Sequence, residues 1–468
     1  MFGKRLFPGG VHPHEGKGGK SVNQSNPIVP LPAPQRLTIP LSQHTGAPAK
    51  PLVQKGDHVL MGQKIGEPAS FVSAAVHASV SGTVTEIGTC YNFGGYEVPC
   101  VVIENDYKDE WVPLHPAEHP ETLTAAEMVQ IVREAGIVGM GGATFPTPVK
   151  LTIAPDKHLE FFVVNGAECE PYLTADHRLM LEKPTQIIDG IRLLMNAFGV
   201  HETLIGVENN KADAIEALRA AAANVEGIKV VSLPVRYPQG GEKQLVYALT
   251  KRVIPGGGLP IDAGCVVLNV GTVFAIDEAV RKGIPLIQRV TTAGGLMNNP
   301  GNYLVRIGTP VRSLINACGG TQPHVRTLIS GGPMMGTAFV NIDIPITKGC
   351  SGILALDKSA IDVDESACIR CGRCLRACPM HLQPAQMDRL IRAERFDEVD
   401  KLGVLNCIEC GACTYVCPAK RLLTQSFRAG KRIVNIRRKK VRDREAAERA
   451  AEEAKKQQAP ADGKGKEE

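Results

Sequence analysis

The sequence predicts a central α/β domain, flanked by β-rich segments and followed by a compact cysteine-rich segment. Three observations support this fold class. Residues 124–290 alternate between helix-like and strand-like patterns. Glycine (48) and proline (33) are frequent while aromatic residues make up only 4%, which favours short strands and tight loops over helical bundles. Eight of the 14 cysteines fall between Cys368 and Cys417.

The alternating region defines the α/β domain. Its helices and strands follow one another in the order expected for a doubly wound parallel sheet, which binds ligands at the carboxyl ends of its strands. The expected helices are 125–135, 184–198 and 211–223, a further helix begins after residue 241, and the expected strands are 160–165, 201–207, 229–233 and 266–270.

Composition and charge exclude several classes of protein. A chain of 468 residues with 43% apolar and 22% charged residues is long enough for about three globular domains. The net charge of +5 is concentrated in residues 428–444, which hold nine Lys or Arg against one acid, so the body is not a basic nucleic-acid-binding surface. No apolar stretch reaches 18 residues, and the N-terminus lacks a signal-peptide pattern, so we expect a cytoplasmic protein.

Two cysteine runs carry the strongest chemical signal. Residues 368–378 and 407–417 each spell C-x2-C-x2-C-x3-C and are each followed by proline. This is the bacterial dicluster ferredoxin pattern, in which the fourth cysteine of each run binds the other [4Fe–4S] cluster. We therefore expect one cluster on Cys368, Cys371, Cys374 and Cys417, and the other on Cys407, Cys410, Cys413 and Cys378. Zinc is the alternative, but zinc ribbons use two C-x2-C pairs. Residues 386–402 between the runs are expected to be helical.

Four polar or glycine-rich segments follow helices or strands of the α/β domain. The first, residues 136–150, has backbone N–H groups suited to a phosphate, although alone it could be a simple turn. The others are residues 165–171, 237–243 and 269–272. Two acids directly after a buried strand favour a site, but a solvated acidic loop remains the alternative.

These segments, in this order, resemble the NADH- and flavin-binding subunit of respiratory complex I. With the N-terminal region and the cysteine runs added, residues 1–430 resemble the C subunit of the Rnf complex, an ion-translocating oxidoreductase. The resemblance implies FMN as a cofactor, NADH or NAD+ as a substrate, and no separate catalytic residue. Lys150 would lie near the flavin ring or phosphate. The implied FMN and NADH residues are Gly139, Gly141, Gly142, Phe145, Lys150, Asn165, Glu168, Glu170, Glu242, Asn269 and Thr272. Ala167 and Gly241 stand where the family has acids.

The flanking segments resemble small β modules. Residues 55–84 resemble a biotinyl/lipoyl barrel-sandwich, but no lysine lies between Lys64 and Lys108, so we expect a docking or structural role. Histidines 12, 14, 58 and 77 match no metal-ligand spacing and are expected at the surface. The expected domains are 1–115 (barrel-sandwich), 116–288 (FMN/NADH-binding), 289–345 (β-grasp), 346–430 (dicluster) and 431–468 (a basic, then mixed-charge tail, partly disordered).

The resemblance implies a peripheral subunit on the cytoplasmic side of the inner membrane. Such a subunit would pass electrons between NADH and its clusters. Partner subunits would connect it to ferredoxin and would move Na+ or H+. Two alternatives remain open at this point: a flavoprotein subunit of a soluble NADH-linked dehydrogenase or hydrogenase, and a non-catalytic iron–sulfur relay.

Overall fold

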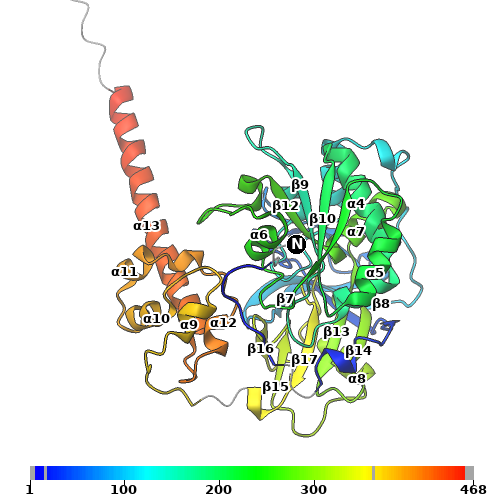
Figure 1. Ribbon diagram of the computed structural model, residues 1–468. Helices are drawn as coiled ribbons and strands as arrows, with labels where there is room; N and C mark the ends of the chain where they lie inside the picture. The colour runs from blue at the N-terminus through cyan, green and yellow to red at the C-terminus, as the bar shows by residue number, and fades with distance from the viewer. Residues whose placement is uncertain (1–5, 15–17, 361–363, 459–468) are drawn as a thin grey trace, which may run out of the picture. The chain divides into compact units, whose positions relative to one another are not determined.

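A computed structural model describes residues 6–14, 18–360 and 364–458 (Figure 1). The chain divides into two compact units, the first ending at Asp364 and the second beginning at Glu365.

A four-stranded parallel sheet forms the centre of the first unit, as predicted. Its order is β11 (Ile228–Leu233), β10 (Glu202–Glu208), β9 (Phe161–Asn165) and β12 (Cys265–Asn269). In the register of β9 and β12, Asn269 lies opposite Asn165. The carboxyl ends of these two strands therefore bring two predicted site residues to the same edge of the sheet.

Helices cover both faces of this sheet, so the domain is doubly wound (Figure 1). Alternate strand residues, such as Phe162 and Val163, enter the two separate cores because successive side chains on a strand point to opposite faces. One face packs against α6 (Glu242–Thr250). The other packs against α1 (Ala125–Glu134), α3 (Ala175–Glu182), α4 (Pro184–Phe198), α5 (Ala212–Ala221) and α7 (Val270–Lys282).

Local sequence signals account for several helix ends. Thr124 and Glu127 form a capping box at the start of α1. Gly199 ends α4 in the left-handed conformation. Val270, expected to be the last residue of a strand, instead begins α7, because the Asn269 side chain caps the helix by accepting from the Gly271 N–H. Helix α3 was not expected from the sequence.

The N-terminal β module consists of two small sheets. The first has the order β2 (Arg36–Pro40), β8 (Glu97–Asn105), β7 (Gly82–Tyr91) and β4 (His58–Val59). The second has the order β3 (Lys50–Pro51), β5 (Lys64–Glu67) and β6 (Val76–His77). His77 is buried, so its expected surface position is wrong: it lies on β6 with its neighbour Val76 also inside the module.

Five strands that follow the α/β domain in the sequence, together with β1 from the N-terminal segment, form a six-stranded sheet. Its order is β1 (Ile28–Pro30), β14 (Gly301–Arg306), β13 (Gln288–Gly295), β17 (Gly352–Leu356), β15 (Thr327–Ser330) and β16 (Thr337–Phe339), and α8 (Val311–Ala317) accompanies it. The sheet extends beyond residue 345, where we expected the β-grasp module to end. Strand β17 is fully buried and pairs with both β13 and β15.

The second unit is a small helical body. It contains α9 (Arg373–Ala377), α10 (Pro384–Arg392), α11 (Phe396–Lys401), α12 (Ala412–Tyr415) and α13 (Leu423–Gln458). The expected connector helix is divided into α10 and α11, because Glu394 adopts a positive φ between them. The core of the unit includes Met387, Phe396 and Phe427.

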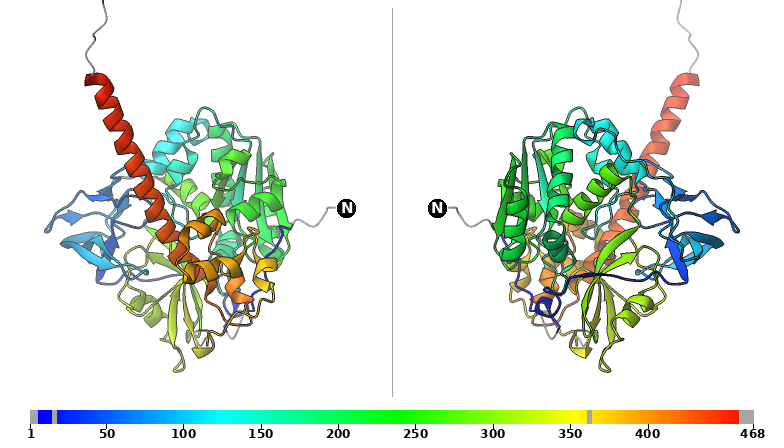
Figure 2. Two further views of the ribbon diagram at one scale, coloured as in Figure 1. Left: turned by 90° about the vertical axis from the view of Figure 1, so that its left-hand side faces the viewer. Right: turned by 90° about the vertical axis from the view of Figure 1, so that its right-hand side faces the viewer.

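Helix α13 starts among the other helices of the second unit and then extends beyond them (Figure 2). Phe427 and Val434 are buried, whereas every side chain from residue 435 to 453 is exposed. The tail, which we expected to be partly disordered, is helical as far as Gln458, and residues 459–468 lie outside the described residues. Within the described part of the chain, no helix has the length and apolarity that a membrane span requires.

Candidate nucleotide and iron–sulfur sites

The eight clustered cysteines surround two pockets in the second unit. One pocket is lined by Cys378, Cys407, Cys410 and Cys413, and the other by Cys368, Cys371, Cys374 and Cys417. In each case the fourth cysteine of one run joins the first three of the other run. The structure thus groups the cysteines in the two sets expected from the sequence.

Both cysteine loops have the same backbone conformation. Arg370 and Glu409 have φ values of 55° and 57°, and the glycines two positions later, Gly372 and Gly411, have φ values of 70° and 79°. Each glycine then caps a short helix, α9 or α12, that carries the third cysteine. Two consecutive turns of this kind wrap the first three cysteines of a run around one point.

The pockets fit an iron–sulfur cluster better than a zinc ion. A zinc ion draws its four sulfurs to about 2.3 Å from one point. Among the described residues, no three His, Cys, Asp or Glu side chains converge closely enough to hold one metal ion. The cysteines instead border a larger space with apolar walls, which include Pro379, Leu382 and Phe427 in one pocket. A cuboidal cluster needs both the space and the apolar surroundings.

The glycine loop, which is predicted to hold the flavin, is an open hairpin of backbone after α1, between Gly139 and Phe145. Its two ends are joined by a hydrogen bond of 2.9 Å from the Gly139 N–H to the Phe145 carbonyl. At its tip, Gly142 has a φ of 115°, and a Cβ there would meet no atom within 4 Å. The tip therefore requires glycine for its conformation and leaves free space beside the backbone, as a bound phosphate or ring would need.

The polar residues at the carboxyl edge of the sheet hold the surrounding loops. Thr272 Oγ1 accepts a hydrogen bond of 2.9 Å from the Met140 N–H of the glycine loop. Asn269 Nδ2 donates to Asp176 Oδ2 at 2.7 Å, and Asn165 Nδ2 donates to the Gly240 carbonyl at 2.9 Å. These predicted residues are brought together, but their side chains fix loop positions.

Lys150 and Glu242 form an accessible ion pair beside this edge. Lys150 lies on α2 (Thr147–Leu151), and Glu242 is the first residue of α6. The Lys150 Nζ lies 2.8 Å from Glu242 Oε1 and donates to the Val267 carbonyl at 3.2 Å. Their side chains are 28% and 38% exposed, so both can reach a ligand. Among the other predicted residues, Gly141 and Gly142 of the glycine loop are exposed as well.

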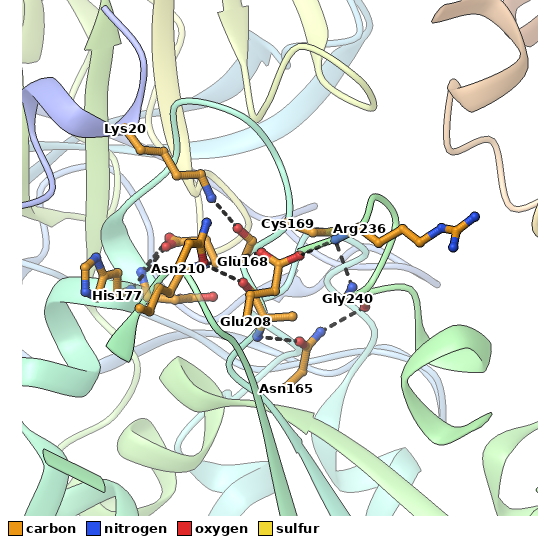
Figure 3. A network of polar contacts seen from close by, with 12 residues as sticks. Lys20, Asn165, Glu168, Cys169, His177, Glu208, Asn210, Arg236 and Gly240 are labelled. Carbon is orange, nitrogen blue, oxygen red and sulfur yellow. Dashed lines mark hydrogen bonds and ion pairs between the residues drawn. The ribbon is translucent and has the colours of Figure 1, made fainter. Parts of the chain in front are cut away.

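Glu168 lies in a tight turn after β9, with a φ of 46° (Figure 3). Its carboxylate accepts backbone N–H groups from Asp176 at 2.8 Å and His177 at 3.2 Å, at the start of α3. Burial and the neighbouring Asp176 carboxylate raise the pKa of Glu168. Glu168 therefore stabilises the N-terminus of α3, a helix that the sequence did not predict, in addition to lying in the predicted site.

Glu170 is held by a segment to which the sequence assigned no chemistry. The backbone N–H groups of Met334 and Met335 donate to its carboxylate at 3.0 Å and 2.9 Å, and the Tyr237 hydroxyl donates at 3.3 Å. Gly332 allows this approach, since a Cβ there would lie 2.2 Å from Glu170 Oε2. Burial raises the pKa of Glu170 to about 7.

Two buried lysines complete this region and were missed from the sequence. The Lys211 Nζ donates to the Ala167 carbonyl at 2.8 Å and lies 3.4 Å from Glu208 Oε2. Lys20, in the short 3-10 helix η1 (Lys20–Val22), donates to the Glu168 carbonyl (Figure 3). Lys211 comes shortly after the end of strand β10, and this position could have marked it as a site residue from the sequence. Nothing local marks Lys20, because it lies 148 residues from its partner.

Four family models match successive parts of the chain. They are an RnfC barrel sandwich hybrid domain at residues 5–108, a Nuo51 FMN-binding domain at 132–278, an SLBB domain at 280–338 and a 4Fe-4S dicluster domain at 360–442. The FMN-binding match covers every predicted nucleotide-site residue, and the dicluster match covers all eight clustered cysteines. The predicted combination of modules is thereby confirmed.

Curated relatives match nearly the whole chain. The C subunit of the proton-translocating ferredoxin:NAD(+) oxidoreductase complex of Clostridium ljungdahlii is 50% identical over 428 residues, which cover 91% of this chain and 93% of the relative. The chain belongs to the family of Rnf complex C subunits. The corresponding subunit of the Na(+)-translocating complex of Acetobacterium woodii is 46% identical, over 93% of this chain and 98% of that protein.

Another member of this Rnf family differs more in length. The C subunit of the ion-translocating oxidoreductase complex of Pseudomonas aeruginosa is 42% identical over 83% of this chain, but the match covers only 50% of that protein. Half of that protein therefore lies outside the match.

Proposed function

We propose that this chain is the NADH-reactive subunit of an Rnf-type complex. It passes electrons between NADH or NAD+ and two [4Fe–4S] clusters by way of FMN. Partner subunits link it to ferredoxin and move Na+ or H+. One observation carries the proposal: a single chain combines an FMN-binding α/β domain with two four-cysteine pockets. We further propose that it works on the cytoplasmic side of the cell membrane, as a peripheral subunit.

FMN supplies the step between a two-electron donor and one-electron carriers, since a flavin accepts a hydride and releases electrons singly. The chain contributes binding and orientation. The backbone N–H groups around Gly141 and Gly142 suit the FMN phosphate. Lys150 provides a cation beside them, and Glu242 holds its ammonium in place. Thr272 fixes the loop that presents these groups, and Asn269 caps α7, the helix that carries Thr272.

The eight cysteines are proposed as the cluster ligands, in the two sets that the pockets define. Cys378 and Cys417 each leave their own run to bind the other cluster, so neither cluster forms on one run alone. Apolar walls shield the pocket of Cys407, Cys410 and Cys413 from water, whereas Cys368 and Cys371 in the other pocket are exposed. Exclusion of water and hydrogen bonding to sulfur set cluster potentials.

The test is FMN binding by the anaerobically reconstituted chain. We expect stoichiometric FMN, and bleaching of its visible absorbance by NADH. Lys150→Met should weaken FMN or NADH binding about tenfold, the size of one charge-assisted hydrogen bond.

Lys157→Met is the matched control for this substitution. Lys157 is an exposed lysine that pairs with Asp262 at 3.0 Å, outside the predicted site. A reconstituted chain that holds iron but no flavin would contradict the proposal and support a simple electron relay. Activity in a chain that never associates with membranes or partner subunits would support a soluble enzyme.

A further inference from the structure

The Gly166–Glu168 turn after β9 is held from both sides by buried lysines. The carbonyl of Ala167 accepts a hydrogen bond of 2.8 Å from the Lys211 ammonium. The next carbonyl, that of Glu168, accepts one from the Lys20 ammonium. Lys211 belongs to the α/β domain itself. Lys20 is brought from the N-terminal segment, and only 7% of its surface is exposed.

The segment that carries Lys20 is fixed against the six-stranded sheet. Gly18 has a φ of 81°, and a Cβ there would lie 2.3 Å from the Gly295 carbonyl oxygen at the end of β13. The Asn23 carbonyl accepts a hydrogen bond of 3.2 Å from Asn302 Nδ2 on β14. Residues 18–23 are therefore anchored at both ends, and Lys20 lies between the two anchors.

The Lys20 ammonium faces an unusually acidic surrounding. The carboxylates within its electrostatic reach include those of Glu168, Glu170 and Asp176, and its charge favours their ionised forms. The Cys169 thiol and the Lys211 ammonium also lie within its reach. Without Lys20, this edge of the sheet would be more negative and would repel the pyrophosphate of a dinucleotide.

We propose that Lys20 is a positioning residue of the dinucleotide site, supplied by the N-terminal segment to fix the Glu168 turn and offset its acids. This inference rests on the proposed function, because it concerns the same site. It gives residues 18–23 a role in NADH binding that the FMN-binding domain cannot fill from its own residues. Figure 3 shows the lysine entering from this segment toward the turn.

The experiment measures NADH oxidation by the reconstituted full chain with ferricyanide as acceptor. Lys20→Met should raise the KM for NADH about tenfold or more and leave kcat within about twofold, because the interaction is lost equally from the bound substrate and the transition state. Lys20→Arg, which keeps the charge, should restore the KM to within about threefold of the wild type. Lys55→Met removes an exposed lysine of the same N-terminal region and should change nothing.

Thermal unfolding and FMN content are recorded for each variant. If Lys20→Met loses FMN, the comparison is made with Lys20→Gln, which keeps a hydrogen-bond donor without the charge. A KM for the uncharged variants equal to that of Lys55→Met would overturn the inference, and so would a Lys20→Arg chain as weak as Lys20→Met. Failure of the wild type to oxidise NADH would instead contradict the proposed function.

Discussion

The cluster-bearing unit and the nucleotide-binding domain build their sites in opposite ways. The cluster pockets draw all their cysteines from two runs, residues 368–378 and 407–417. The nucleotide region combines a glycine loop, three strand ends, the N-terminal segment with Lys20 and the backbone of Met334 and Met335. The first site is encoded locally, and the second depends on the tertiary fold. This difference determines which substitutions should act on one site alone.

The largest effect is expected at the cysteines. Cys410→Ser should remove about four of about eight irons, because a cluster with three ligands is labile. Cys378→Ser should abolish the same cluster as Cys407→Ser, although Cys378 lies in the other run. Iron content and the EPR spectrum of the reduced protein identify which cluster is lost.

Cys169→Ala is the control, since this half-buried thiol accepts a backbone hydrogen bond from Gly240 in the nucleotide region and does not line either cluster pocket. If Cys378→Ser removed the cluster of Cys368 instead, the crossed ligand sets would be wrong.

The next largest effect is expected at Lys211. Its ion pair with Glu208 is buried, with both side chains 2% exposed. Lys211→Met would leave the Glu208 carboxylate unpaired and should destabilise the first unit by about 3–5 kcal/mol. Thermal unfolding measures the change. Lys229→Met, which breaks an exposed pair with Glu202 on the same sheet, should cost at most about 1 kcal/mol. Equal losses of stability in the two variants would show that burial does not govern this pair.

The two sites also differ in how much of each the sequence could predict. The parallel sheet follows from the alternation of helix-like and strand-like patterns, and the cysteine sets follow from spacing. The clamp on Glu170 by the Met334 and Met335 N–H groups involves backbone atoms, which every sequence has, so no residue pattern could predict it. Lys20 was missed for a related reason: a buried lysine is recognised by its partners, which lie 148 residues away.

A pH-dependent effect should distinguish the two units further. The buried carboxylate of the cluster unit, Asp388, pairs with Arg392 and Arg421. The Nζ of Lys348, in the first unit, donates to the carbonyls of Ala75 and Gly136, and burial lowers the pKa of Lys348 to about 7. Because the folded pKa lies below the ordinary value, the unfolded chain binds more protons between pH 7 and about 10.5. Buried Lys348 therefore destabilises the folded state less as the pH rises through this range.

The measurement is the difference in stability between the wild type and Lys348→Met from about pH 7.5 to about pH 9.5. The difference should shift in favour of the wild type by up to about 1.4 kcal/mol per pH unit. Neighbouring His44 and His77 have pKa values lowered by burial, so they titrate below this window and should not contribute. A pH-independent difference would contradict the account of Lys348.

The smallest effect is expected at the end of α13. Truncation after Arg442 removes residues 443–453, whose side chains are all exposed, with the residues that follow them, and leaves Phe427 and Val434 in the core. Iron content, FMN content and NADH oxidation of the isolated chain should remain within about 20% of the full-length values, since surface substitutions of this kind change stability little. A loss of iron on truncation would show that the exposed helix supports the cluster fold.

The central claim is that the nucleotide site feeds the clusters of the same chain. Its most direct test is anaerobic titration of the reconstituted protein with NADH, followed by visible absorbance and by EPR of frozen samples. The account predicts that FMN bleaches and that reduced-cluster signals appear, and that Cys410→Ser loses one of these signals but still bleaches. Clusters that stay oxidised in the wild type while FMN is fully reduced would contradict it.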